Sequence, residues 1–486
     1  MFNPSEKFNA PKSPAQEKPK ERLGEFQERT KPLTENEQCI LNNLTETAAW
    51  FNKSLKEIDN RRANPDLAEY LREFESAPLT IERPVEEKEI IESAINSDLV
   101  FLGDYHHLSK SQDFVAETIE KIAQASTRPS VLAIEFVECS KSGQKALDDY
   151  MSGKIGEEEF LKRIKFKSWD NPGHWPAYRH VLESAKRSGI KVYGLNTNRK
   201  EKSLARTDEI LAENLRDVAN KNPGSRIMIH VGEDHLSEDH LPRELSLLDE
   251  FNQKKSTTIF QNLSPVYFDA LRKYKDFHIP KSFQLKSQGH PMYNLITAPL
   301  ITELVANMEY LQLNEGYEDQ VEFLTADTSY ALVERIVNVL GLKRREDTYD
   351  SVPPAYSSES EVERELQNFK KVGAFRSYFK ILNQKGSVYM PGSKDGKHSP
   401  ALIIRRFRLK KVLEELAKFI ANPEKKVEDF ARLSPTEQKN LQAFQYLCSK
   451  VFIPERTPLD ESGEEKEGEK MFRDFLAGKK IGTPEI

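Results

Sequence analysis

Cysteine is scarce in this chain, which contains only Cys39, Cys139 and Cys448 among its 486 residues. Their wide separation excludes a disulfide framework and a paired-cysteine metal site. Long apolar runs are also missing, since the longest uncharged stretch, Ser287 to Thr302, contains two prolines and falls short of the ~18 apolar residues that a membrane span needs. The N-terminus shows no apolar segment typical of an export signal. We expect no membrane span and a cytoplasmic location.

An excess of positive charge is missing too, because 72 Lys and Arg residues stand against 78 Asp and Glu residues, for a formal net charge of −6. This balance gives no support for a nucleic-acid partner. The composition divides the chain into four expected parts: a disordered N-terminal tail over 1–33, N-terminal helices over 34–80, an α/β domain over 81–280, and a mainly helical C-terminal region over 281–486 with a flexible linker near 348–361.

Four short apolar runs in the α/β domain each end on a cluster of polar residues. The runs cover 99–102, 131–134, 190–195 and 227–231. Continuous apolar runs predict parallel strands buried on both faces, and the connections between them are long enough for crossover helices. A fifth strand is expected over 257–262. The predicted fold class is therefore α/β, with a mostly parallel sheet flanked by helices.

The polar clusters follow the strands directly, at the sheet edge where open parallel sheets bind ligands. Imidazole and carboxylate groups there favour a divalent metal, and the candidate ligands are Asp104, His106, His107 and His235. Adjacent histidines on an extended segment point opposite ways, so at most one of His106 and His107 faces a given centre. The alternative is a hydrogen-bonded loop without a ligand. His174, His180, His230 and His240 are assigned to packing or the surface.

Glu135 directly follows an apolar run, where a carboxylate is costly to bury unless it is paired or bound. It could ligate a metal or act as general base on metal-bound water. The alternative is a structural ion pair with Arg199 or Lys200. Glu138 and Asn196 complete the expected pocket.

The loop from Trp169 to Trp175 holds a Pro-Gly turn between two tryptophans, in the long connection between the second and third strands. Long loops in compact domains are often functional, which favours a lid over the strand ends with Trp169 facing the pocket. The alternative is a loop held by two core aromatic residues.

Taken in order, these residues resemble a ChaN-type domain of the TIKI, TraB and erythromycin esterase superfamily over roughly 95–265. The segments that carry the resemblance are Leu102 to His107, Ala133 to Phe136, Leu147 to Phe160, Trp169, Trp175 to Tyr178, Gly194 to Asn196 with Arg199, and Val231 to His235. The family motifs fall on Gly103, Asp104 and His106, on Glu135, and on Gly232 and His235. Asp104 stands where the family usually has Glu.

The resemblance implies a parallel sheet flanked by helices and leaves three hypotheses for function. ChaN-like proteins bind haem in iron uptake, which would place Tyr105 and His106 near the iron and allow a homodimer. TIKI proteases and the esterases imply a metal-dependent hydrolase of a peptide or ester bond, with Glu135 activating water and Arg199 stabilising an oxyanion. The third is a non-catalytic scaffold whose C-terminal helices contact partners.

Overall fold

The computed structural model describes most of the α/β domain and parts of the flanking regions. The described residues are 26–58, 65–77, 79–168, 174–196, 203–287, 289–302, 304, 306, 326–342, 355–356, 387–390, 401–404, 409–421, 432–455 and 463–481.

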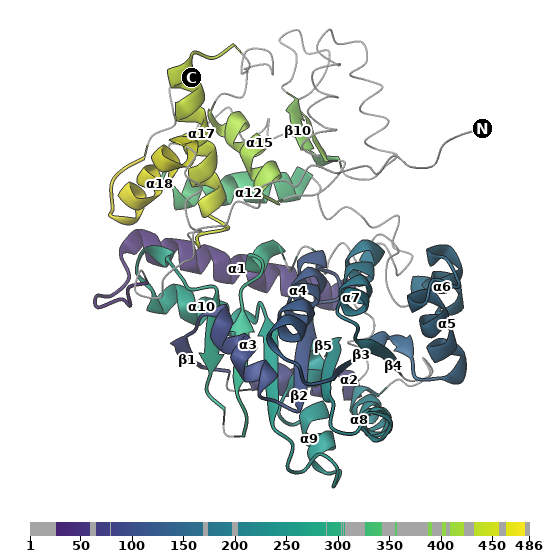
Figure 1. The fold of residues 1–486 in the computed structure, drawn as a ribbon. Helices are drawn as coiled ribbons and strands as arrows, with labels where there is room; N and C mark the ends of the chain where they lie inside the picture. The colour runs from purple at the N-terminus through teal and green to yellow at the C-terminus, as the bar shows by residue number, and fades with distance from the viewer. Residues whose placement is uncertain are drawn as a thin grey trace, which may run out of the picture.

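An eight-stranded mixed sheet forms the centre of the molecule, in the order β1-β7-β8-β6-β2-β5-β3-β4 (Figure 1). The strands are β1 Ile81–Pro84, β2 Leu99–Asp104, β3 Ser130–Glu138, β4 Lys191–Asn196, β5 Arg226–Gly232, β6 Ser256–Gln261, β7 Ser282–Leu285 and β8 Met292–Leu295. The six strands from β8 to β4 are parallel, and β7 pairs antiparallel with both β1 and β8. The predicted α/β fold class is confirmed.

The five strands expected from apolar runs are β2 to β6. Alternate residues of β2 enter different cores, with Leu99 and Phe101 in one and Val100 and Leu102 in the other. Burial on both faces explains why these runs are continuously apolar. β7 and β8 follow residue 280, at the start of the region expected to be mainly helical. The sheet therefore continues past the expected end of the α/β domain.

Helices cover both faces of the sheet (Figure 1). They are α3 Glu87–Ile95, α4 Ser109–Ala125, α5 Lys141–Met151, α6 Glu157–Arg163, α7 Trp175–Arg187, α8 Leu204–Lys221, α9 Leu241–Ser246 and α10 Ser264–Lys273. Ile119 of α4 and Val181 of α7 pack with Val100 and Leu102, whereas Leu211 of α8 packs with Phe101.

The N-terminal helices are α1 Glu35–Ile58 and α2 Pro65–Ser76. Thr34 caps α1, because its backbone N–H donates to Glu37 at 2.8 Å and its hydroxyl accepts from the Glu37 N–H at 3.2 Å. The tail expected to be disordered is corrected for residues 26–33, since Arg29 donates its backbone N–H to Lys273 at 2.8 Å. Residues 1–25 lie outside the described part of the chain.

The described C-terminal region is mainly helical and lies against α1 (Figure 1). Its elements are α12 Ala326–Val339, α15 Leu409–Ala421, α17 Pro435–Lys450 and α18 Gly463–Leu476, with a small sheet of β9 Ala355–Tyr356, β10 Ser387–Met390 and β11 Ala401–Ile404. Asn43 of α1 donates to the Val451 carbonyl at 2.9 Å, and Thr34 donates to the Leu476 carbonyl at 2.9 Å. Apart from residues 355–356, the linker expected near 348–361 lies outside the described residues. Within the described ranges, no helix has the length and apolar character to cross a membrane.

Candidate functional site

Strand register brings the predicted site residues to one edge of the sheet. β5 lies between β2 and β3, with Asp104 opposite Gly232 and Ile134 opposite His230. Glu135 follows Ile134, and His235 lies in the short 3₁₀ turn Glu233–Leu236 after β5. The carboxyl ends of three adjacent parallel strands thus supply the centre of the candidate site.

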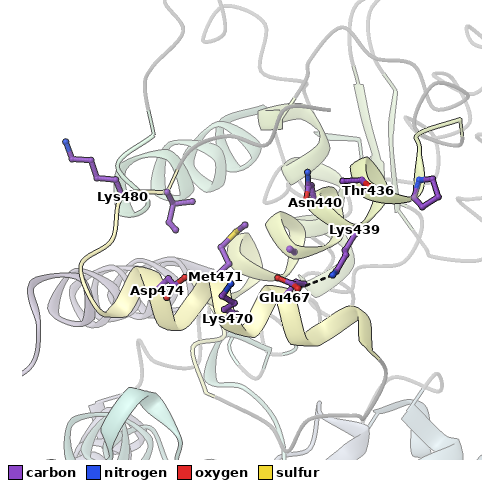
Figure 2. Close-up of a pocket in the computed structure, with 11 residues that line it drawn as sticks. Thr436, Lys439, Asn440, Glu467, Lys470, Met471, Asp474 and Lys480 are labelled. Atoms are coloured by element: carbon purple, nitrogen blue, oxygen red, sulfur yellow. Dashed lines mark hydrogen bonds and ion pairs between the residues drawn. The ribbon is translucent and has the colours of Figure 1, made fainter.

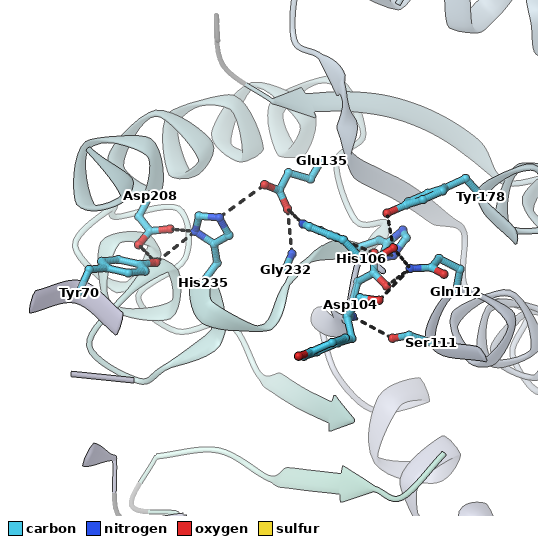
Figure 3. Close-up of polar contacts among 12 residues, drawn as sticks. Tyr70, Asp104, His106, Ser111, Gln112, Glu135, Tyr178, Asp208, Gly232 and His235 are labelled. Atoms are coloured by element: carbon cyan, nitrogen blue, oxygen red, sulfur yellow. Dashed lines mark hydrogen bonds and ion pairs between the residues drawn. The ribbon is translucent and has the colours of Figure 1, made fainter. Parts of the chain in front are cut away.

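The Glu135 carboxylate lies between His106 and His235, which are 129 positions apart in the sequence (Figure 3). Its Oε2 lies 3.8 Å from Nε2 of His106, and its Oε1 lies 3.5 Å from Nε2 of His235. The Gly232 backbone N–H donates to Oε2 at 2.8 Å. His106, and not His107, faces this carboxylate.

The contacts continue beyond both histidines. Nδ1 of His106 lies 2.9 Å from Oδ2 of Asp104, and Nδ1 of His235 lies 2.6 Å from Oδ1 of Asp208. The Tyr70 hydroxyl donates to the other oxygen of Asp208 at 2.7 Å. We call the series Tyr70, Asp208, His235, Glu135, His106 and Asp104 the polar chain.

Asp104 is a fully buried carboxylate with several partners. Gln112 donates to its Oδ1 at 2.6 Å, and Nε2 of His230 lies 3.2 Å from its Oδ2, at ion-pair distance but without hydrogen-bond geometry. Burial alone would raise the pKa of Asp104, but His230 and His106 outweigh burial and hold the pKa well below its usual range. Because an ionised carboxylate only accepts hydrogen bonds, Nδ1 of His106 carries the proton in this contact.

Glu135 is ionised for a similar reason. Burial raises its pKa, whereas His235, His106 and the Gly232 amide lower it, with a net pKa of about 2. Such a carboxylate is a weak proton acceptor near neutral pH. In this form Glu135 is a charged partner of His106 and His235, and its role as a general base stays a prediction.

His235 lies between two carboxylates and is only 5% exposed. Burial lowers its pKa, but Asp208 and Glu135 together raise the pKa well above its ordinary value. The ring is therefore an imidazolium that donates from both nitrogens. Burial, followed by Asp208, raises the pKa of Tyr70, so this hydroxyl stays protonated and donates.

Exposure separates the members of the polar chain. The side chain of His106 is 27% exposed, against 1% for Asp104, 9% for Glu135 and 6% for His235. His106 is thus the member of these four that is best placed to meet a ligand from solvent.

The remaining predicted residues lie around this centre or outside the described chain. The His107 ring lies 6.3 Å from the His106 ring, and the Tyr105 backbone N–H donates to the Ser111 hydroxyl at 2.9 Å. Glu138 pairs with Asn196 across β3 and β4. Trp169 and Arg199 are outside the described residues, and so is most of the predicted lid.

Sequence reasoning did not select Tyr70, Asp208, Gln112 or His230 for the site. His230 was assigned to packing, yet it lies on the same face of β5 as Gly232, beside the Asp104 strand. Because alternate residues of a strand share a face, the sequence could have placed His230 on the same face as Gly232. Tyr70 and Asp208 belong to α2 and α8, and their approach to His235 depends on helix packing that no local pattern encodes.

Among the described residues, no group of three or more His, Cys, Asp or Glu side chains is arranged to hold a metal ion. The predicted ligands Asp104, His106, His107 and His235 do not form such a group. Asp104 and His106 contact each other at 2.9 Å, whereas His235 contacts Asp208 and Glu135.

A groove of about 670 Å³ lies elsewhere, between α17 and α18 (Figure 2). Its lining mixes Lys439, Lys470, Glu467 and Asp474 with Met471, and Lys439 is paired with Glu467 at 3.0 Å. None of the residues predicted from the strand ends lines this groove.

The segment that contains the ends of β2 and β3 is similar to a known protein family. Residues 90–210 match the family described as "Haem-binding uptake, Tiki superfamily, ChaN". The resemblance to a ChaN-type domain is confirmed over this segment. The match includes Asp104, His106 and Glu135 of the ChaN-like domain and ends before β5 and His235. No curated protein sequence matches the chain.

Three solved structures are similar to parts of the chain. The type III effector HopBA1 is 16% identical, covers 45% of this chain and 97% of its own, and gives a TM-score of 0.32. ChaN of Campylobacter jejuni, solved with cofacial haem, is 14% identical. The match covers 39% of this chain and 92% of the ChaN chain, with a TM-score of 0.31. The C-terminal region of Pasteurella multocida toxin, with a thiol-protease-like triad, is 14% identical. The match covers 41% of this chain and 26% of the toxin chain, with a TM-score of 0.25.

Proposed function

We propose that the ChaN-like domain binds haem and that His106 would hold its iron. The observation that carries the proposal is the 2.9 Å contact between Nδ1 of His106 and the buried carboxylate of Asp104. A carboxylate on Nδ1–H fixes the tautomer, orients the ring and makes Nε2 a stronger donor. Histidine is a common axial ligand of haem, and bound haem supplies an iron capable of redox chemistry and ligand exchange.

The arrangement suits haem better than a bare metal ion. Haem iron takes four ligands from the porphyrin and needs one or two from the protein, whereas a structural or catalytic zinc needs at least three. His106 can supply one such ligand from a partly exposed position. Glu135 lies 3.8 Å from the same Nε2 and would supply negative charge near a ligand held by His106.

Tyr105 is the competing iron ligand, because tyrosinate also binds haem iron. It neighbours His106 at the end of β2 and is partly exposed. Haem ligation by Tyr105 and by His106 gives different spectra, so single variants separate the two roles.

Hemin titration of the purified chain tests the proposal. We expect a shifted Soret band and saturable binding that is lost in His106→Ala. His180→Ala is the matched control, because His180 is also partly exposed and its Nδ1 contacts a carboxylate, Asp113, at 2.9 Å. Tyr105→Phe should keep binding if His106 is the ligand. Unchanged hemin binding in His106→Ala would refute the assignment.

The alternatives give distinct results in the same preparation. Stoichiometric metal in elemental analysis, lost in His235→Ala and without hemin binding, would favour a hydrolase of peptide or ester bonds. Absence of both haem and metal would favour a scaffold with partner contacts through the C-terminal helices.

A homodimer and a cytoplasmic location complete the proposal. Light scattering of the full chain with and without hemin tests the dimer, and cell fractionation tests the location.

A further inference from the structure

The shortest contacts of the polar chain lie at the end remote from His106. Asp208 is 1% exposed, and its two oxygens accept from His235 at 2.6 Å and from Tyr70 at 2.7 Å. Each oxygen therefore has its own donor. Asp208 and Tyr70 come from α8 and α2, so two helices outside the strand ends meet at one buried carboxylate.

Tyr70 is held firmly in this position. Its ring is stacked on His240 with centroids 3.8 Å apart and planes 13° apart, and its hydroxyl also lies 3.2 Å from Nδ1 of His235. The residue is 4% exposed. A hydroxyl fixed from both its ring and its oxygen end restricts where Asp208 can place its carboxylate.

The contacts extend from Asp208 through His235 and Glu135 to His106, the proposed haem ligand. His235 uses Nδ1 for Asp208 and directs Nε2 to Oε1 of Glu135, at 3.5 Å. Oε1 of Glu135 lies against His235, and Oε2 accepts from the Gly232 backbone N–H. These two contacts fix the orientation of the carboxylate, which places Oε2 3.8 Å from Nε2 of His106 (Figure 3).

We propose that Tyr70 and Asp208 are positioning residues for the ligand site, acting through His235 to hold Glu135 beside His106. The part of this proposal that concerns haem rests on the function proposed above. It makes α2 a component of the site, although α2 lies outside the segment that matches the ChaN family.

Spectroscopy of the haem-free, full-length chain labelled with ¹⁵N-histidine tests the positioning directly. Tyr70→Phe removes one oxygen and keeps the ring that stacks on His240. We expect it to shift the ring-nitrogen resonances of His235 and of His106, although Asp208, His235 and Glu135 separate Tyr70 from His106 along the polar chain. Asp208→Asn should shift both further. Tyr193→Phe is the matched control, since Tyr193 is also buried and donates its hydroxyl to Asn222 at 3.1 Å.

The outcomes are decisive without haem. Shifts at both histidines in Tyr70→Phe, absent in Tyr193→Phe, support the proposal, because a purely structural role would lower thermal stability without moving the His106 resonances. His106 resonances that stay at their wild-type positions in Tyr70→Phe overturn it. If Asp208→Asn does not fold, Tyr70→Phe alone decides.

Hemin titration of the same variants extends the test. In a chain that binds hemin, Tyr70→Phe should raise the Kd by about tenfold, the lower end of the range for partners behind metal ligands, and alter the Soret band. Failure of the wild-type chain to bind hemin refutes the proposed function, while the ring-nitrogen result still judges the positioning roles.

Discussion

Nδ1 of His106 and Oδ2 of Asp104 lie 2.9 Å apart, with one residue between them in the chain. β2 ends at Asp104 and the chain turns over His106 and His107, so this contact forms in the turn that follows the strand. It places a charged acceptor behind the most exposed imidazole of the polar chain.

Asp104→Asn should weaken hemin binding by about 10- to 100-fold, the usual effect of removing a carboxylate behind a metal ligand. The amide can donate as well as accept, so it no longer fixes the tautomer of His106. Hemin titration measures the effect. Asp98→Asn, at the opposite end of β2, removes a carboxylate paired with Arg128 at 2.7 Å and should leave hemin affinity unchanged. Equal affinities for wild type and Asp104→Asn would contradict the role of this carboxylate.

His235 should make stability fall as the pH rises. Its folded-state pKa is raised, so its contribution is fully present below the unfolded pKa of about 6.5 and is lost as the pH rises toward the folded value. The slope in this window approaches about 1.4 kcal/mol per pH unit for one proton. Urea unfolding from pH 6 to 9 measures it, and His235→Gln should lack this component. Parallel pH profiles for the two proteins would refute the buried imidazolium.

Glu135→Gln should destabilise the chain above pH ~4.5, where the unfolded carboxyl is ionised. A folded pKa of about 2 corresponds to about 3 kcal/mol of stabilisation, which the wild type loses as the pH falls from ~4.5 toward 2. The stability difference between wild type and variant should therefore shrink in acid, as measured by urea unfolding at pH 6 and below 4. Glu138→Gln, at the end of the same strand, is the control. A pH-independent difference would argue against this charge.

Gly232→Ala should disturb the site without disturbing the fold. A Cβ at this position would lie 3.1 Å from Nε2 of His106 and 3.7 Å from Oε2 of Glu135, whereas the backbone φ of −56° suits alanine. We expect hemin affinity to fall by about tenfold with far-ultraviolet circular dichroism unchanged. Gly156→Ala, whose Cβ meets nothing within 4 Å, is the control. Wild-type affinity in Gly232→Ala would mean that His106 does not bind the iron.

The central strands could be predicted because burial on both faces leaves a continuous apolar run in the sequence. β1, β7 and β8 were missed, since each has only four residues and all three lie near prolines in segments without a clear period. Their pairing depends on the preformed sheet more than on local preference.

The site was predictable as far as it belongs to strand ends. Asp104, His106, Glu135 and His235 follow apolar runs, and parallel strands bring such ends together. Asp208 lies inside an amphipathic helix and Tyr70 in another, where a polar or aromatic residue usually indicates a solvated or packed face. Only the packing of α2 and α8 reveals that both residues reach His235.

The position of β5 has a consequence for biosynthesis. β2 and β3 are not neighbours in the sheet, because both pair with β5, which begins about ninety residues after β3 ends. While a ribosome has translated only as far as α8, the nascent chain contains Asp104 and Glu135 but not the strand that joins them. The acid–imidazole series can therefore close only after residues 226–232 have left the exit tunnel and inserted between two strands made earlier.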